Sequence, residues 1–153
     1  MNHKKSILIV DDDKAILENT KGILQLNGYS VDAVETGHEA IEMSKVQFYN
    51  LALLDIKLQD MEGTQLLAKM NRTTPKMMKI MITGYPMVKN AVESLNFGAD
   101  AYLLKPVDPE ELLKVIENKL KEQEETEEIS EERVNEWIKS RVRKLKANYN
   151  AKL

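Results

Sequence analysis

The sequence predicts a doubly wound α/β domain that is followed by a charged helical extension. Over the first 120 residues, short apolar runs typical of strands alternate with helical patterns, and five such units imply a parallel sheet wound on both faces. All six Gly and all four Pro lie within the first 109 residues at intervals that suit turns, so the rest is a different kind of sequence. A length of 153 residues suffices for one ordinary domain and such an extension.

Five apolar runs are expected to form the strands. Their residues are apolar almost without interruption, which is typical of a parallel sheet covered by helices on both faces. The runs occupy residues 6–10, 30–34, 50–54, 77–82 and 101–104. Each run has the length of an ordinary strand.

Helical patterns follow the runs. In the first pattern, apolar residues recur from Ile16 to Leu24, and Gly28 supplies a C-terminal stop. In the second, Thr36 and Glu39 form a capping box ahead of the apolar positions. The third is marked by Leu66, Leu67 and Met70, and the fourth by Val88, Ala91, Val92 and Leu95.

The fifth helix has strong start signals and leads into the extension. Asp108 suits the N-cap, and Pro109 suits the first helical position. Beyond it, residues 121–132 hold seven Glu and one Lys, whereas residues 133–153 hold seven Lys or Arg and one Glu. Residues 121–128 contain no apolar side chain, and they predict either an exposed continuation of the fifth helix or a flexible linker.

The last part of the chain predicts a helix with one apolar face. Ser130 is expected to be its N-cap, with Ile129 and Val134 as a hydrophobic staple around it. An apolar stripe then recurs at helical spacing, with Trp137 alongside. This apolar stripe consists of Val134, Ile138, Val142, Leu145 and Tyr149.

Composition excludes several classes of site. The chain has no Cys, which excludes disulfides, a thiolate nucleophile and Cys-based zinc or iron–sulfur sites. A net charge of −3 does not indicate a polyanion-binding protein as a whole. The longest apolar runs, residues 7–10 and 51–54, are far shorter than the roughly 20 residues that span a bilayer, so we expect a cytoplasmic protein without membrane insertion.

Polar side chains stand at the ends of four predicted strands. They are Asp11, Asp12 and Asp13 after the first strand, Asp55 after the third, Thr83 after the fourth and Lys105 after the fifth. In an open parallel sheet the carboxyl ends of the strands meet at one edge, where ligands bind. We therefore expect these side chains to converge.

The expected cluster suits a phosphoryl group and a hard cation. Carboxylates packed together repel each other unless a cation or a proton intervenes, and an all-oxygen set suits Mg²⁺ better than a soft metal. Thr83 can donate a hydrogen bond to a phosphoryl oxygen, and Lys105 can supply a compact positive charge. The sequence therefore predicts a place where a phosphoryl group is received and held.

Four segments of the chain carry these residues. They read Ile-Leu-Ile-Val-Asp-Asp-Asp at 7–13, Leu-Ala-Leu-Leu-Asp-Ile-Lys-Leu at 51–58 with Met-Glu-Gly at 61–63, Met-Ile-Thr-Gly at 81–84, and Tyr-Leu-Leu-Lys-Pro at 102–106. As a set they resemble the receiver (CheY-like) domain of two-component response regulators, over about residues 4–120. The resemblance implies a flavodoxin-like (βα)5 fold with a five-stranded parallel sheet in the order 2-1-3-4-5, plus the C-terminal helical extension.

The resemblance also implies a role for each residue. Asp55 would accept a phosphoryl group from a histidine kinase or a phosphotransfer protein. The Mg²⁺ ligands would be Asp11, Asp12, Asp55 and the backbone carbonyl of Lys57. Thr83 and Lys105 would contact the phosphoryl oxygens, and Tyr102 would change rotamer as Thr83 moves.

Three further positions would modulate access to the phosphoryl group or its loss. By resemblance, Lys57 and Tyr85 influence dephosphorylation, and we expect them to shield the phosphoryl group from water better than small polar residues would. A side chain in place of Gly84 is expected to crowd the phosphoryl site. The Lys105–Pro106 bond is cis in similar domains, an arrangement that only an X-Pro bond adopts cheaply.

These expectations describe a signalling phosphoacceptor and not an enzyme. Residues 1–120 would form the receiver and residues 121–153 the charged extension, with no separate effector domain. Phosphorylation would switch the surface formed by the fourth helix, the fifth strand, the fifth helix and the C-terminal helix. Either a downstream protein or a second copy would bind that surface.

Two alternatives carry less weight. The basic end of the extension could contact DNA, but the neighbouring acidic run offsets its charge, so pairing of the two halves within the chain or between subunits is preferred. A Mg²⁺-dependent phosphohydrolase would use similar groups through an aspartyl phosphate. Such enzymes place a second Asp two residues after the nucleophile as general acid, and here that place is Lys57.

Overall fold

The computed structural model describes residues 4–70, 73, 75–84, 92, 96 and 98–152. Along the chain the elements are β1 Ser6–Val10, α1 Lys14–Leu26, β2 Ser30–Val34, α2 Gly37–Val46, β3 Leu51–Asp55, α3 Gly63–Lys69, β4 Met78–Thr83, β5 Ala101–Leu104 and α5 Pro109–Ala151. Every strand lies within one residue of its predicted range. The helix expected at 88–95 falls largely outside the described residues.

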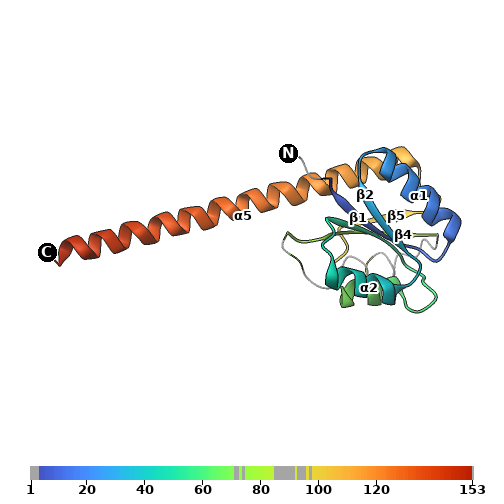
Figure 1. Ribbon diagram of the computed structural model, residues 1–153, viewed down its shortest axis with the longest axis horizontal. Coiled ribbons are helices and arrows are strands. Elements are labelled where there is room, and N and C mark those ends of the chain that lie inside the picture. Colours follow the sequence, from blue (N-terminus) through green and yellow to red (C-terminus); the bar gives the residue numbers. More distant parts are fainter. Residues whose placement is uncertain are drawn as a thin grey trace.

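The strands form one parallel sheet in the order β2-β1-β3-β4-β5. This confirms the doubly wound α/β prediction. Figure 1 shows α2 on one side of the sheet and α1 with the first part of α5 on the other. All strands therefore point their carboxyl ends toward one edge.

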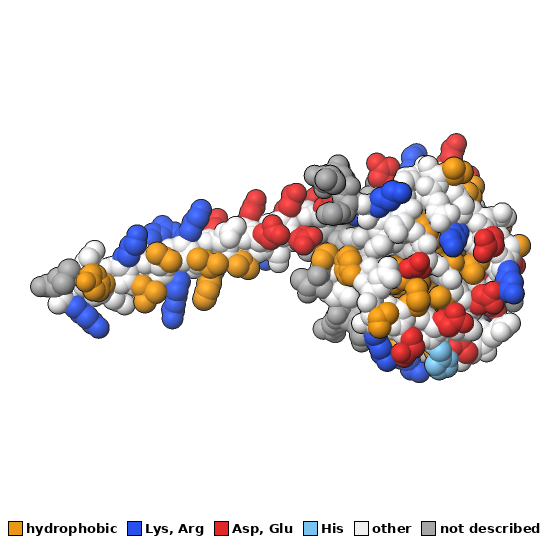
Figure 2. All heavy atoms as spheres, in the orientation of Figure 1, with side chains coloured by type: hydrophobic (Ala, Val, Ile, Leu, Met, Phe, Trp, Pro, Cys, Tyr) orange, Lys and Arg blue, Asp and Glu red, His pale blue; other side chains and the backbone are white. Residues whose placement is uncertain are grey.

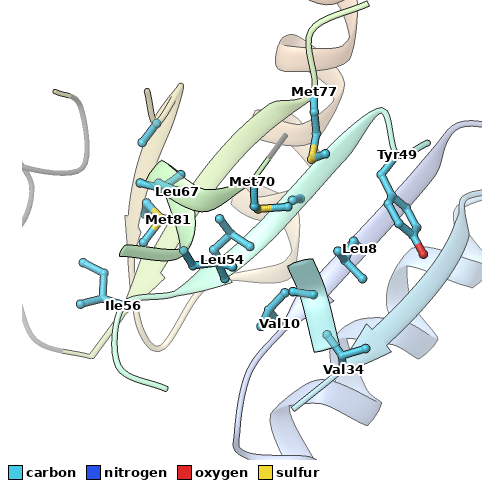
Figure 3. Packing of buried hydrophobic residues seen from close by; sticks show 14 of the residues in the cluster. Leu8, Val10, Val34, Tyr49, Leu54, Ile56, Leu67, Met70, Met77 and Met81 are labelled. Atoms are coloured by element: carbon cyan, nitrogen blue, oxygen red, sulfur yellow. The ribbon is translucent and has the colours of Figure 1, made fainter. Parts of the chain in front are cut away.

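Alternate residues of the strands feed two hydrophobic layers. Leu8 and Val10 of β1 belong to the layer under α2 and α3, which Figure 3 shows. Ile7 and Ile9 of the same strand belong to the layer under α1 and α5. Because both sides of each strand are covered, an uninterrupted apolar run is what this sheet requires.

Both ends of α1 are capped, and Gly28 ends the helix where the sequence predicted. The Asp13 carboxylate accepts hydrogen bonds from the N–H groups of Ala15 (3.0 Å) and Ile16 (3.2 Å), which satisfies free donors of the first turn. After the last turn, Gly28 has a φ of +89°, a left-handed conformation that favours glycine. This geometry ends α1 and turns the chain into β2.

The start of α2 is held by a residue from a different part of the chain. Thr36 accepts the expected bond from the Glu39 N–H (3.2 Å), while the Asp60 carboxylate accepts from the N–H groups of Gly37 and His38, each at 2.9 Å. The His38 ring also contacts Asp60. Burial alone would raise the pKa of Asp60, but the bonds from Gly37 and His38 prevail and lower it to about 2.

The fifth helix continues for 43 residues without interruption. Ser130 is therefore an interior residue of α5, and its expected role as an N-cap is wrong. Of the two alternatives for residues 121–128, the structure shows the helical continuation. Glu, Lys and Gln have high helix propensities, and the stretch contains no Gly or Pro that would end the helix. Although α5 is long, no helix in the described part of the chain is apolar enough to cross a membrane.

The straight path of α5 also corrects the idea that its acidic and basic halves pair within one chain. Figure 1 shows the helix leaving the body of the molecule in one direction, so the two halves lie end to end. Only another molecule can bring an acidic half beside a basic half.

Gln123 fixes the point at which α5 leaves the body. Its side chain is buried, and its amide nitrogen donates to the carbonyl oxygens of Asn50 (2.9 Å) and Lys76 (2.6 Å). The Asn50 side chain donates back to the Gln123 oxygen at 3.1 Å. Nearby, Lys5 forms an ion pair with Glu124 at 2.9 Å. The helix is thus tied to the segments that precede β3 and β4.

Candidate functional site

The predicted strand-end residues meet at the carboxyl edge of the sheet. The Lys105 ammonium lies 2.9 Å from the Asp11 carboxylate and 3.1 Å from the Asp55 carboxylate. Asp11 follows β1, Asp55 ends β3 and Lys105 follows β5. The sheet order places β3 beside β1, which is why residues so far apart in sequence converge.

Three carboxylates form the acidic part of the site. One oxygen each from Asp11, Asp12 and Asp55 lies within 4.8 Å of the others. Lys105 contacts one oxygen of Asp11 and one of Asp55. The other Asp11 oxygen accepts the Asp13 N–H at 2.9 Å, and the other Asp55 oxygen accepts the Lys57 N–H at 3.2 Å. These bonds hold the two buried carboxylates in fixed orientations.

The charges of the site depend on each other. Burial raises the pKa of Asp55, the Lys105 ammonium lowers it, and the Asp11 carboxylate raises it again; the net direction is upward. For Lys105, burial lowers the pKa, but its bonds to Asp11 and its attraction to Asp55 prevail and raise it. The buried site therefore carries an unfavourable excess of negative charge.

The donor set fits a hard divalent cation. Carboxylate oxygens are the ligands that Mg²⁺ prefers, and three from separate residues within 4.8 Å can share one ion while water completes its coordination. An added cation would also offset the excess negative charge of the buried carboxylates. The residues present thus fit the expected Mg²⁺.

Thr83 and Tyr102 lie on the two strands beyond Asp55. Thr83 is the fully buried last residue of β4, and its neighbour Ile82 pairs with Asp55. The Lys105 N–H donates to the Thr83 carbonyl at 2.7 Å. Tyr102 is half-buried in β5 and packs against the core layer under α2 and α3. The Lys105–Pro106 bond is cis, as expected.

Lys57, Gly84 and Tyr85 are the positions expected to modulate access to the phosphoryl group. Lys57 is exposed, two residues after the end of β3. Among the described residues no atom lies within 4 Å of a Cβ built at Gly84, and the expected crowding of a phosphoryl group there stays a prediction. Tyr85 lies outside the described residues.

The close approach that requires glycine is at Gly63. A Cβ there would lie 2.8 Å from the Ile56 Cα and 2.7 Å from the Met81 methyl group, and the Gly63 N–H donates to the Ile56 carbonyl at 2.5 Å. The first turn of α3 therefore rests directly on the chain that leaves Asp55. Sequence reasoning missed this contact, because one glycine gives no local sign of what it touches.

A cleft beside the acidic cluster was also not predicted. It has a volume of about 240 Å³ and lies between α1 and the segment joining β5 to α5. Ile16 and Ile23 line it from α1, Pro106 and Val107 line it from the segment before α5, and Asp55 also lines it. The carboxyl edge of the sheet thus has an apolar surface next to it.

Comparison with known proteins agrees with this geometry. Residues 7–117 match the family model described as "Response regulator receiver domain". The chain belongs to the response regulator receiver family. The matched range contains all the strand-end residues and stops within α5.

Individual relatives show the same likeness. The cell cycle response regulator CtrA of Brucella ovis is 31% identical over 107 residues, which are 70% of this chain and 46% of that protein, so the chain spans less than half of the curated relative. A crystal structure of a CheY-like receiver domain protein from Methanospirillum hungatei is 54% identical with a TM-score of 0.78, and covers 81% of this chain and 99% of that one. The receiver domain of a LuxO repressor protein from Vibrio parahaemolyticus is 27% identical with a TM-score of 0.77, covering 83% and 98%.

Proposed function

We propose that Asp55 is the phosphoacceptor of this response regulator receiver. An Asp55 oxygen would attack the phosphorus of a phosphohistidine on a histidine kinase or phosphotransfer protein. The bond between phosphorus and imidazole nitrogen breaks, and an acyl phosphate forms on Asp55. The observation that supports this choice is the position of the buried Asp55 carboxylate. It lies beside the acidic pair Asp11 and Asp12 and also contacts Lys105.

The neighbouring side chains divide the remaining tasks. Asp11, Asp12, Asp55 and the Lys57 carbonyl would hold Mg²⁺, which neutralises negative charge on the phosphoryl oxygens and carboxylates when bound. Lys105 already lies 3.1 Å from Asp55 and would pair with the phosphoryl group there. Thr83 would donate its hydroxyl to a phosphoryl oxygen, and Tyr102 would follow its movement.

Phosphorylation of the purified chain tests the assignment. With acetyl phosphate and Mg²⁺, intact-mass spectrometry should show at most one added phosphoryl group, lost after Asp55→Asn. Asp13→Asn is the matched control, because Asp13 belongs to the same acidic run yet caps α1, and Asn caps a helix equally well. Full labelling of the Asp55→Asn chain would refute the assignment, and so would continuous turnover of phosphate esters.

A protein donor has to touch the surface around Asp55, and the cleft along α1 offers it an apolar surface. Ile16→Glu should therefore slow transfer from the kinase while leaving labelling by acetyl phosphate unchanged. Gln25→Glu, on an exposed part of the same helix away from the cleft, is the control. Equal losses with both donors would place the effect of Ile16 on folding and not on docking.

We further infer that the chain acts as a switch and not as a turnover enzyme. The acyl phosphate on Asp55 would shift the surface of the fourth helix, β5 and α5 between two arrangements, and a downstream partner would bind one of them better. Binding of that surface to a partner should depend on beryllofluoride, a phosphoryl mimic, with Mg²⁺. Equal binding with and without the mimic would contradict the switch.

A further inference from the structure

The apolar stripe continues the face with which α5 packs on the sheet. The buried residues of the first half and the stripe of the second half follow one spacing of four, four and three residues. The series is Leu112, Ile116, Leu120, Gln123, Glu127, Glu131, Val134, Ile138, Val142, Leu145 and Tyr149. The pattern repeats every 11 residues, which is three turns at about 3.67 residues per turn. This value is close to the 3.6 of an α-helix, so these positions stay on one side of α5.

In the second half no other described residue covers that face. The five stripe residues and Trp137 are each between 45% and 68% exposed. Figure 2 shows their orange side chains along one edge of α5, with red side chains toward the body and blue ones toward the C-terminus. Gln123 holds the base of the helix, so the stripe cannot fold back onto the receiver.

We propose that the stripe binds a second copy of this chain in an antiparallel orientation. A two-fold axis at Ile138 brings each face position between Glu127 and Tyr149 onto a face position of the second copy, and Ile138 onto itself. Val134 then faces the partner's Val142, Glu131 faces the partner's Leu145, and Glu127 faces the partner's Tyr149. This inference goes beyond the proposed phosphorylation and does not depend on it.

Charge complementarity selects this orientation. Residues 121–132 hold seven Glu and one Lys, and residues 133–153 hold seven Lys or Arg and one Glu. Antiparallel pairing places Lys146 within one turn of the partner's Glu131, and Lys152 within one turn of the partner's Glu127. A parallel pair would place each acidic segment beside its own copy and each basic segment likewise, which is repulsive.

The area available is sufficient for a dimer. The exposed stripe with Trp137 offers roughly 600–700 Å² per helix if large side chains present about 150–250 Å² each. A standard interface buries about 800 Å² per partner. The aliphatic parts of the flanking Lys and Glu side chains can supply the difference.

The mass of the full chain in solution is the first test. We expect a dimer by sedimentation at micromolar concentration, with Asp55→Asn dimerising equally because phosphorylation is not required. Ile138→Glu should raise the dissociation constant at least ~100-fold by placing a charge at the centre of the interface. Ile129→Glu is the matched control, since Ile129 is similarly exposed but lies outside the face series.

Orientation is tested by cross-linking, which the absence of Cys makes specific. A mixture of Glu127→Cys and Tyr149→Cys chains should form the mixed disulfide, whereas a parallel pair would link each variant to itself. A wild-type monomer, a dimer that survives Ile138→Glu, or a self-linked Tyr149→Cys chain would each overturn the proposal. A monomer that binds anionic vesicles or duplex DNA through Ile138 would assign the stripe to that ligand instead and leave the phosphorylation chemistry intact.

Discussion

The two halves of α5 use the same face in opposite ways. Between Pro109 and Gln123 this face is buried against the sheet, whereas from Val134 to Tyr149 it is open to solvent. Helical periodicity is the same in both, so periodicity alone does not reveal what an apolar face touches. The difference comes from the sheet, which ends beneath the helix after its fourth turn.

Truncating one side chain in each half of α5 should give the largest difference in unfolding free energy. Ile116 is fully buried, so Ile116→Ala should lower the free energy of unfolding by about 3 kcal/mol. Ile138→Ala should change it by less than about 0.5 kcal/mol in dilute, monomeric protein. Urea unfolding followed by circular dichroism measures both, and similar losses would mean that the second half also packs on the receiver.

Gln123 marks the border between the halves and gives the next largest effect. Gln123→Ala leaves two partly buried backbone carbonyls without their donor and should cost about 2 kcal/mol of unfolding free energy. Gln25→Ala, on an exposed part of α1, should cost almost nothing. An equal loss in the two variants would show that Gln123 does not anchor the helix.

A helix start within the receiver provides a pH-dependent test. The pKa of Asp60 is lowered to about 2 in the folded state, so its contribution is present above its unfolded pKa near 3.8 and disappears as the pH falls toward 2. Asp60→Asn keeps only one of the two oxygens that accept from Gly37 and His38, so it should cost about 1 kcal/mol at pH 7 and less near pH 2. A pH-independent difference from wild type would contradict the capping role.

The smallest expected effect is a gain in stability and not a loss. Burial and the Asp11 charge disfavour ionised Asp55, so neutral Asp55→Asn should raise stability by up to about 1 kcal/mol in the absence of Mg²⁺. Thermal unfolding measures this change. Adding Mg²⁺ should stabilise wild type and have little effect on Asp12→Ala, whereas equal stabilisation of both would exclude Asp12 from the metal site.

The receiver body could be predicted because its signals are local or follow from topology. Unbroken apolar runs identify the strands, and parallel connections bring Asp11, Asp55 and Lys105 to one edge. The Asp108 cap and the Gly28 stop lie next to the helices that they bound. Patterns of this kind are read from a few neighbouring residues.

The errors and omissions concern contacts between distant segments. Asp60 caps a helix that begins 23 residues earlier. Gln123 is buried, and it forms hydrogen bonds with the segments before β3 and β4. Neither residue differs in sequence from an ordinary surface residue. Ser130 failed for a related reason: a residue that favours a helix start does not make one where the preceding residues are already helical.

The unbroken α5 gives the receiver a mechanical lever. It begins four residues after Lys105, and its part beyond Gln123 extends for about 40 Å at 1.5 Å per residue. A tilt of only about 5° at the base would therefore sweep Tyr149 through about 3 Å, a distance comparable with half a helical turn. Motion too small to see at the sheet edge would become a positional signal at the far tip.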